Sequence, residues 1–406
     1  MMHSLATIFQ VVAVLGCLAS SVYYGMCLGS ASRFLRARRA EEARAESVEG
    51  NAPAQLPPVS ILKPLKGTDP DIYRSFRSHC LQDYPEYEII FGVSDPADPA
   101  VASVEQLQRE FPDRAIRLIV CREKLGANVK VSNLHQMLQS ARYQHLLVND
   151  SDIRVERDYL RNIFAPLADE HVGMVTCLYR GAPAGTLGSK LEALGISTDF
   201  SAGVLVAQQL EGGLHFGLGS TLAFRRRDLE RIGGFLSIVD FLADDYELGR
   251  RISDLALNDH ASDGNRLKIL LSGEVVDTHL PAYDFSGFLA HQMRWARGVR
   301  DARLGGYIGL VSTFGLMWSL LNLIAAHAAP WSWVVLAVVF GLRIAVAIAV
   351  GKSVLQDDKL PGQLWLLPVR DLIAVGVWLA SFAGHTVVWR GEKFRLKNGR
   401  LSQIKR

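Results

Sequence analysis

Short apolar runs alternate with amphipathic, helix-length stretches from about residue 59 to residue 304. The apolar runs are rich in β-branched residues, which favour strands. Alternation of this kind predicts an α/β domain built on a mostly parallel sheet. The expected strands are Val59–Leu62, Glu88–Val93, Ile116–Cys121, His145–Val148, Gly173–Leu178, Ser220–Phe224 and Leu267–Leu271, and the expected helices include Asp71–Leu81, Val101–Phe111, Val129–Ala141 and Arg157–Ala168.

The N-terminal end carries a long uncharged run. Leu5–Gly29 has 25 residues without a formal charge, more than the ~20 residues that cross a bilayer as a helix. A signal peptide is the alternative, but its first segment would lack Lys and Arg, and no small-x-small cleavage site follows. We therefore expect a membrane anchor. The positive-inside rule places the chain after it in the cytoplasm, because the run is followed by Arg33, Arg36, Arg38, Arg39 and Arg44.

Two apolar runs near the C-terminus predict further membrane segments. They are Gly305–Ala329 and Trp331–Gly351, and a tight turn with Pro330 as helix breaker joins them. Arg343 lies inside the second run, where a charge is costly. We expect its side chain to face a partner helix or to reach the membrane surface.

The last apolar run, Leu364–Trp389, is less regular, because it contains Pro368, Arg370 and Asp371. It is either an interfacial segment followed by a span or a re-entrant element. The tail from Arg390 holds seven Lys or Arg and one Glu, which favours the cytoplasmic side. Three plain C-terminal crossings would place this tail outside, so a plain crossing by the last run conflicts with the charge pattern.

These patterns divide the chain into six segments. We expect a transmembrane anchor at 1–32, a linker at 33–58, a soluble α/β domain at 59–283, an interfacial amphipathic helix at 284–304, a membrane region at 305–390 and a basic tail at 391–406.

Charge and cysteine usage exclude several classes of protein. Lys and Arg number 44 and Asp and Glu number 41, so the net charge of +3 argues against a polybasic nucleic-acid binder. Five cysteines form no C-x-x-C pair, which argues against a disulfide framework or a thiolate zinc site. There is no phosphate-binding loop of the G-x-x-x-x-G-K type, and Gly217-Leu218-Gly219 is read as a turn.

Two carboxylates follow the strand expected at His145–Val148. Asp150 and Asp152 are spaced i and i+2 where a turn can bring them together, and ligands bind at the carboxyl ends of strands in such sheets. Two hard oxygen donors suit Mg²⁺ or Mn²⁺, whose remaining ligands are often substrate phosphates. An Asx-turn or a helix N-cap is the structural alternative.

A second acidic pair, Asp244 and Asp245, lies at an expected helix start. The helix dipole favours carboxylates there, which is the structural reading. Adjacent acids also raise each other's pKa, so that one of them can take a proton from a hydroxyl. Both readings stay open from the residues alone.

The stretch from His291 to Gly298 carries Arg294 and Trp295 on an amphipathic segment that leads into the membrane. Arg294 is suited to bind phosphate, and Trp295 to stack on a sugar. An interfacial helix whose arginines reach toward the membrane surface is the structural alternative, and spacing alone favours it.

Three further residues are candidates by position. Asp95 follows the strand ending at Val93, so it can reach a ligand or close a turn. Lys130 begins a helix, where a cation is unfavourable unless an anion lies nearby. His279 follows a strand-like run and is either a third metal ligand or a structural histidine.

Taken in order, six motifs resemble the ceramide glucosyltransferase family, and within it the bacterial hopanoid-biosynthesis glycosyltransferases. The resemblance covers the soluble part and both membrane ends. The motifs are Val-Ser-Ile-Leu-Lys-Pro-Leu-Lys-Gly (59–67), Asp-Tyr-Pro-Glu-Tyr-Glu-Ile-Ile-Phe-Gly-Val-Ser-Asp (83–95), Lys-Leu-Gly-Ala-Asn-Val-Lys-Val-Ser-Asn-Leu (124–134), Asp-Ser-Asp-Ile-Arg-Val (150–155), Ala-Asp-Asp-Tyr (243–246) and His-Gln-Met-Arg-Trp (291–295).

The resemblance implies a GT-A-type, Rossmann-like domain that takes a sugar from a UDP-sugar with inversion. By motif position, Asp95 matches the aspartate that holds the nucleotide, Asp150 and Asp152 match the metal-binding pair, and Asp245 matches the general base. Lys130 and Arg294 are then expected to bind the nucleotide sugar, and Asp244, His291 and Trp295 to lie on the side of the sugar or acceptor. His291 departs from the Gln or Arg of the family signature, and its charge depends on pH.

The implied partners are a UDP-sugar, Mg²⁺ or Mn²⁺, and a membrane lipid, with no nucleic acid. The hopanoid subgroup uses N-acetylglucosamine and the ceramide subgroup glucose, so the acceptor is a hopanoid polyol or ceramide. We expect an integral protein of the bacterial inner membrane with a cytosolic catalytic domain. The alternatives are a processive polysaccharide synthase, for which these spans are few, and a non-catalytic lipid-binding scaffold, which would not need the acidic set.

Overall fold

The computed structural model describes residues 2–48, 56–257, 266–389 and 392–404. The chain divides into two compact units. The first, here the membrane unit, contains residues 1–40, 185–209 and 282–398; the second, here the sheet unit, contains residues 41–184, 210–281 and 399–406. The chain therefore leaves the sheet unit and returns to it before its C-terminal third.

The sheet unit is built on one eight-stranded mixed sheet with the order β3-β2-β1-β4-β7-β6-β8-β5. Strands β1 to β4 are parallel, and so are β6 and β8, whereas β7 is antiparallel to both of its neighbours. The strands are β1 (Val59–Pro64), β2 (Tyr87–Val93), β3 (Ala115–Val120), β4 (His145–Val148), β5 (Ile153–Arg154), β6 (Val172–Ala182), β7 (Leu222–Arg225) and β8 (Lys268–His279).

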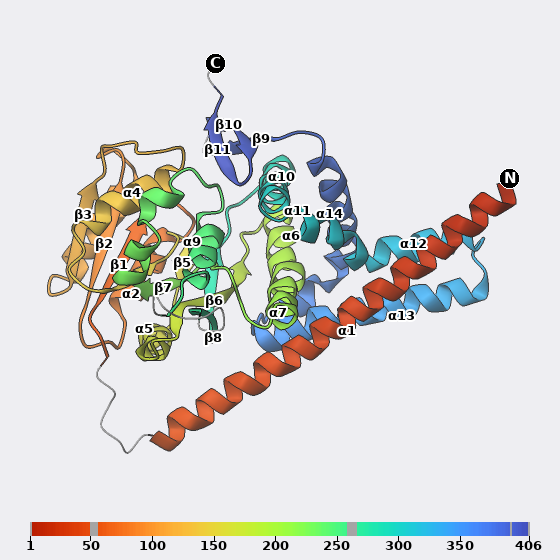
Figure 1. Cartoon of the computed structure of the whole chain (residues 1–406), viewed down its shortest axis with the longest axis horizontal. Helices are drawn as coiled ribbons and strands as arrows, with labels where there is room; N and C mark the ends of the chain where they lie inside the picture. Colours follow the sequence, from red (N-terminus) through yellow and green to blue (C-terminus); the bar gives the residue numbers. More distant parts are fainter. Residues whose placement is uncertain (1, 49–55, 258–265, 390–391, 405–406) are drawn as a thin grey trace. The chain divides into compact units, whose positions relative to one another are not determined.

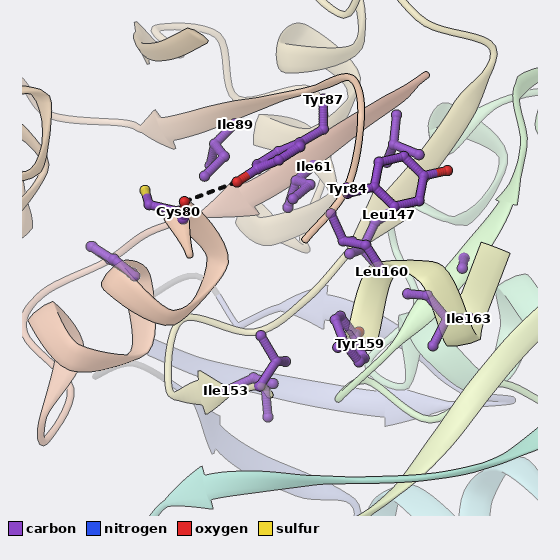
Figure 2. Close-up of a cluster of buried hydrophobic side chains, with 14 of the residues drawn as sticks. Ile61, Cys80, Tyr84, Tyr87, Ile89, Leu147, Ile153, Tyr159, Leu160 and Ile163 are labelled. Atoms are coloured by element: carbon purple, nitrogen blue, oxygen red, sulfur yellow. Dashed lines mark hydrogen bonds between the residues drawn. The ribbon is translucent and has the colours of Figure 1, made fainter. Parts of the chain in front are cut away.

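Amphipathic helices cover this sheet, and their apolar faces form its core. In Figure 2, side chains from α2 and α5 gather with strand residues such as Ile61 and Leu147, and the Tyr87 hydroxyl donates to the Cys80 carbonyl at 3.0 Å. The helices are α2 (Ile72–Cys80), α3 (Ala100–Glu110), α4 (Val129–Leu138), α5 (Tyr159–Phe164), α8 (Arg226–Arg231) and α9 (Asp244–Ser253), with short turns η1 (Ala165–Ala168) and η3 (Phe235–Ile238). The expected Rossmann-like α/β class is confirmed, and the sheet is mixed.

The membrane unit is mainly helical (Figure 1). Its elements are α1 (Met2–Val48, whose last turns belong to the sheet unit), α6 (Leu187–Gly195), η2 (Ile196–Phe200), α7 (Ser201–Leu210), α10 (Phe285–Ala302), α11 (Leu304–Gly309), η4 (Leu310–Thr313), α12 (Gly315–Ala325), α13 (Pro330–Ala347), η5 (Ile348–Val354), η6 (Leu360–Leu366), α14 (Leu367–Ser381), β9 (Thr386–Trp389) and β10 (Glu392–Lys397). Strand β11 (Arg400–Gln403) belongs to the sheet unit.

Within the part of the chain that the structure describes, three helices are long and apolar enough to cross a membrane: Ala6–Ala43, Pro330–Val354 and Leu360–Ser381. A fourth candidate, Leu304–Thr313 with Gly315–Ala325, is bent by 52° at its break. A break is therefore present in the first C-terminal run, where we expected none, and the last run is helical to Ser381 and ends in β9. The segment with Pro368, Arg370 and Asp371 forms a helix, because the proline sits in the first turn, where it is tolerated.

Two residues of α1 form hydrogen bonds with backbone carbonyl and amide groups at this bend, where the helix is interrupted. The Tyr24 hydroxyl donates to the Thr313 carbonyl at 3.1 Å and accepts from the Gly315 amide at 3.3 Å. Ser20, one turn earlier, donates to the Ser312 carbonyl at 2.7 Å. Backbone groups in a bilayer need such partners, so α1 makes the break tolerable.

The linker expected at 33–58 is helical over its first part, because α1 continues to Val48. Residues 34–45 are rich in Ala, Arg, Glu and Leu, which are strong helix formers. Residues 49–55 of the expected linker lie outside the described residues.

Candidate active site

The candidate residues of the sheet unit gather at one edge of the sheet. Asp95 follows β2, Asp150 and Asp152 follow β4, and His279 ends β8. Because these strands run in the same direction, their carboxyl ends meet at that edge. The antiparallel β7 begins there, so the turn before it, which contains Gly219, faces the same region.

Lys130 is the cation around which two of the acidic motifs meet. Its Nζ lies 2.8 Å from Asp150 Oδ1 and 3.1 Å from Asp244 Oδ2. Burial disfavours the charge of Lys130, but the two carboxylates outweigh burial and hold its pKa above the ordinary value. Asn128 caps α4 through Val131 and also donates to Asp244 at 3.3 Å. We expected an anion near Lys130 at the start of α4, and two carboxylates, those of Asp150 and Asp244, lie there.

Asp245 is oriented by the backbone of the turn before β7. The Gly219 amide donates to Asp245 Oδ2 at 2.8 Å, and the Tyr246 amide donates to Oδ1 at 2.8 Å. Burial and the neighbouring Asp244 carboxylate raise the pKa of Asp245 to about 6, although Lys130 opposes the rise. The carboxylate is therefore a stronger base than an exposed aspartate and is still ionised near neutral pH.

Because Gly219 has no side chain, the carboxylates of Asp150 and Asp245 can both lie close to its backbone. A Cβ atom at position 219 would lie 3.0 Å from Asp150 Oδ2 and 3.1 Å from Asp245 Oδ2. These distances are shorter than ordinary contacts, so a side chain there would push at least one carboxylate away. Asp150 itself is 43% exposed, which leaves it open to a ligand.

Asp152 and His279 have other partners. The Thr278 hydroxyl donates to Asp152 Oδ2 at 2.5 Å, and burial with the nearby Asp150 carboxylate raises the pKa of Asp152 to about 7. His279 Nε2 lies 3.6 Å from Asp71 Oδ2. In the described parts of the chain no three His, Cys, Asp or Glu side chains are grouped to hold a metal ion.

Asp95 lies at the same edge but apart from this cluster. It is exposed, and its Oδ1 accepts from the Ala97 amide at 2.9 Å, as in an Asx-turn. Strand β1 separates its strand from β4, and neighbouring strands are about 4.8 Å apart, so roughly 10 Å divides the two strand ends. A ligand as long as a nucleotide sugar spans such a distance.

Comparison with known proteins identifies the family. The family model for glycosyl transferase family 21 matches residues 12–402. The chain belongs to glycosyl transferase family 21.

Relatives of this family 21 protein include ceramide glucosyltransferase 3 of Caenorhabditis elegans, which is 25% identical over 363 residues, 85% of this chain and 74% of that protein. The ceramide glucosyltransferase of Komagataella phaffii is 34% identical over 107 residues, 25% of this chain and 21% of that protein. Among solved structures, the mannosyltransferase PcManGT from Pyrobaculum calidifontis, in complex with GDP-mannose and Mn²⁺, is 18% identical with a TM-score of 0.47, covering 89% of this chain and 99% of that chain. The resemblance to ceramide glucosyltransferases is confirmed.

The remaining signature residues of the family 21 protein lie on α10 of the membrane unit. His291 Nδ1 lies 3.3 Å from Glu192 Oε1, and its ring stacks on Tyr283 with centroids 5.4 Å apart. Trp295 packs against His291 and against Phe200, with centroids 5.5 and 5.8 Å apart. Arg294 lies between them on the same helix and is partly buried. These residues belong to the membrane unit, whereas Asp150, Asp244 and Asp245, here called the acidic cluster, belong to the sheet unit.

Sequence reasoning missed Lys63, which lies in β1 and is fully buried. Its Nζ donates to the main-chain carbonyl of Asp150 at 3.1 Å, so it holds the turn that carries the acidic pair. Burial lowers the pKa of Lys63 to about 7. A lysine directly after the expected strand Val59–Leu62 was the available signal, because a buried cation needs a dedicated partner.

The close approach at Gly219 yields a direct test. In Gly219→Ala the new methyl group separates Asp150 from Asp245, so we expect sugar transfer to fall at least tenfold while the thermal unfolding temperature changes little. Gly213→Ala is the matched control, because nothing lies within 4 Å of a Cβ at that position. Equal activity of both variants with the wild type would show that the close approach of the two carboxylates is not needed.

Proposed function

We propose that this family 21 glycosyltransferase transfers a sugar with inversion from a UDP-sugar, N-acetylglucosamine or glucose, to a hydroxyl group of a membrane lipid, a hopanoid polyol or ceramide. The observation that carries the proposal is the Asp245 carboxylate. It is held by the Gly219 amide beside Asp150, and its pKa is raised to about 6. A carboxylate so placed is suited to act as a general base.

In this mechanism Asp245 takes the proton of the lipid hydroxyl as that oxygen attacks the anomeric carbon. The new bond joins the acceptor oxygen to the sugar, and the bond between the anomeric carbon and the diphosphate oxygen breaks, which releases UDP. The two amide N–H groups at Asp245 fix its orientation before the reaction, so little reorganisation is needed in the transition state.

Charge balance supports a divalent cation beside Asp150. Asp150 and Asp244 form ion pairs with Lys130, and Asp245 also interacts with it electrostatically, so three carboxyl groups share one ammonium group. The excess negative charge would repel a diphosphate unless a cation were bound. Mg²⁺ is held by one or two carboxylates and substrate phosphates, so a cage of three protein ligands is not required. Asp150 and Asp152 would hold the ion, which would neutralise the charge of the departing diphosphate.

The other candidates have supporting roles in this proposal. Asp95 contacts the nucleotide, and Lys130 and Arg294 bind the nucleotide sugar. Asp244 keeps Lys130 in place through its 3.1 Å ion pair, and His291 and Trp295 lie on the side of the sugar or acceptor.

A lipid acceptor agrees with the apolar helices and with the relatives. The described residues include three helices long and apolar enough to cross a membrane, and the relatives of the chain include proteins named ceramide glucosyltransferases. The arginines after the first run favour a cytosolic catalytic domain. We propose the bacterial inner membrane as the location, where a cytosolic UDP-sugar and a lipid hydroxyl meet.

Replacing the base tests the mechanism. We expect Asp245→Asn to lower transfer by about 10²- to 10⁴-fold, because the amide cannot accept the proton. Binding of the UDP-sugar, measured by calorimetry, should remain within a few-fold of wild type. Product is measured by mass spectrometry of purified protein with both donors and both lipids.

Asp254→Asn is the control, since Asp254 caps the C-terminus of the same helix, is exposed and forms ion pairs with Arg250 and Arg266. This variant should keep wild-type turnover. Near-normal turnover of Asp245→Asn would remove Asp245 from the mechanism, and a polymer product would favour a polysaccharide synthase instead.

Metal removal is a separate test. Treatment with EDTA should abolish transfer, and Mg²⁺ or Mn²⁺ added in excess should restore it, because the clustered carboxylates otherwise repel the diphosphate. Transfer that continues at the original rate after complete chelation would exclude the proposed metal site.

The raised pKa of Asp245 predicts an acid limb in the pH profile. A base must be deprotonated to act, so kcat/KM should be highest above about pH 7 and fall about tenfold per unit below pH 6. The residual activity of Asp245→Asn should lack this limb. An acid limb centred near pH 4, the ordinary value of an aspartate, would contradict the environment described for Asp245.

A further inference from the structure

The membrane unit contains a buried ionic cluster that the proposed chemistry does not use. Arg343 of α13 has a side chain only 4% exposed, and its Nη2 lies 2.5 Å from Asp199 Oδ1 and 2.7 Å from Asp371 Oδ1. It also donates to the Thr198 carbonyl at 3.2 Å. Arg343 is thus fully engaged, which fulfils the expectation that it faces a partner helix.

The neighbouring Arg370 of α14 is different. Its side chain is 9% exposed, and Nη2 donates to Gln292 Oε1 at 2.9 Å and lies 3.7 Å from Asp199 Oδ2. Nε and Nη1 are both buried and have no hydrogen-bond partner within the described part of the chain. An arginine has five N–H donors, and those on Nε and Nη1 of Arg370 are buried without an acceptor in this part of the chain.

The guanidinium of Arg370 is held in this position by α6. A Cβ on Gly195 would lie 2.5 Å from Arg370 Nη2 and 2.6 Å from Nε. The guanidinium therefore lies directly against the backbone of Gly195, and a side chain at that position would displace it. This close approach fixes the direction of the unused donors.

The cluster continues to the signature residues of α10. Gln292 donates to Glu192 Oε2 at 2.6 Å, and Glu192, which is 2% exposed, lies 3.3 Å from His291 Nδ1. A continuous path of polar contacts therefore runs from Arg370 through Gln292 and Glu192 to His291, beside Trp295. It links helices with membrane-length apolar runs to the part of α10 that the family signature marks.

Leaving the N–H groups of a buried arginine without acceptors is costly. Water is scarce among membrane-crossing helices, and ionisable groups there commonly mark substrate sites. Nε and Nη1 point to opposite edges of the guanidinium, so a ligand that completes both hydrogen bonds must offer an acceptor oxygen to each. The free donors are then explained as part of a binding site rather than as a structural defect.

Charge indicates which oxygen fits. Two arginines, Arg343 and Arg370, face three carboxylates, those of Asp199, Asp371 and Glu192, so the cluster carries one excess negative charge when His291 is neutral. A phosphate would add further negative charge. A neutral oxygen, such as a hydroxyl or an amide carbonyl, suits the site better.

We propose that Arg370, seated on Gly195 and held by Gln292, binds neutral oxygens in the head group of the lipid acceptor. The proposal rests on the proposed function, which it extends by naming the residue that selects uncharged, hydroxyl- or amide-bearing lipids. The site is distinct from the acidic cluster that carries the chemistry.

The test separates binding of the lipid from binding of the donor. Arg370→Met should raise the KM for a neutral lipid about ten- to a hundred-fold, the loss expected for hydrogen bonds to a charged group. The KM for the UDP-sugar should stay within about twofold. The probes are NBD-labelled C6-ceramide and a hopanoid polyol, with phosphatidic acid as a charged competitor that should not displace them.

Gly195→Ala provides a second variant that keeps the arginine. Its methyl group displaces the guanidinium, so it should reproduce the rise in lipid KM. Gly376→Ala is the matched control on α14, because nothing lies within 4 Å of a Cβ there; it should behave as wild type. If Arg370→Met fails to fold, Gly195→Ala decides.

An unchanged lipid KM in the folded variants, or equal losses for lipid and donor, would overturn the proposal. Binding of the labelled ceramide and the polyol is also measured without donor, by fluorescence and competition. If the wild type binds a neutral lipid through Arg370 but glycosylates none, the proposed function fails and the binding site stands. If the wild type binds neither lipid, the binding site is excluded.

Discussion

The ion pairs of Lys130 are the interaction on which the acidic site depends. Asp150 ends β4, Asp244 and Asp245 begin α9, and Lys130 lies on α4. Without the ammonium group, three carboxylates from two distant parts of the sequence would repel one another in a partly buried space. The lysine holds these segments together while leaving them net negative.

Backbone groups do the finer positioning around this ion pair. The Gly219 amide orients Asp245, and Lys63 holds the Asp150 carbonyl from beneath. Both contacts come from the rigid edge of the sheet. In the membrane unit, too, a backbone group positions a charged side chain, because the guanidinium of Arg370 lies against the backbone of Gly195. In each unit a glycine marks the place where a charged group needs the backbone itself as its support.

The elements of the sheet unit were predictable because their signals are local. All seven expected strands are present, since β-branched apolar runs and turn residues specify them, but β8 continues to His279, eight residues past the expected end at Leu271. The direction of β7 was not predictable, because the chain leaves the sheet unit between β6 and β7 and passes through the membrane unit. The two-residue β5 was missed because it is too short to show a pattern.

The candidate site shows the same limit. Sequence placed Asp150, Asp152 and Asp245 near strand or helix ends, and it indicated an anion beside Lys130. It did not reveal that Asp152 turns toward Thr278, that His279 turns toward Asp71, or that Gly219 is a contact point rather than a simple turn. These facts depend on side-chain partners far apart in the chain, which no local spacing encodes.

The hydroxyl groups of Ser20 and Tyr24 give the first helix a role beyond tethering. They complete the backbone hydrogen bonds of the bent segment around Ser312, Thr313 and Gly315. A shortened protein without this helix would expose those polar groups to hydrocarbon. Exchange for a foreign anchor of equal length and hydropathy would not repair the loss, because the foreign helix would lack hydroxyls at these two positions. The N-terminal segment is thus an internal component of the helical bundle, and shortening the protein from that end removes part of its architecture.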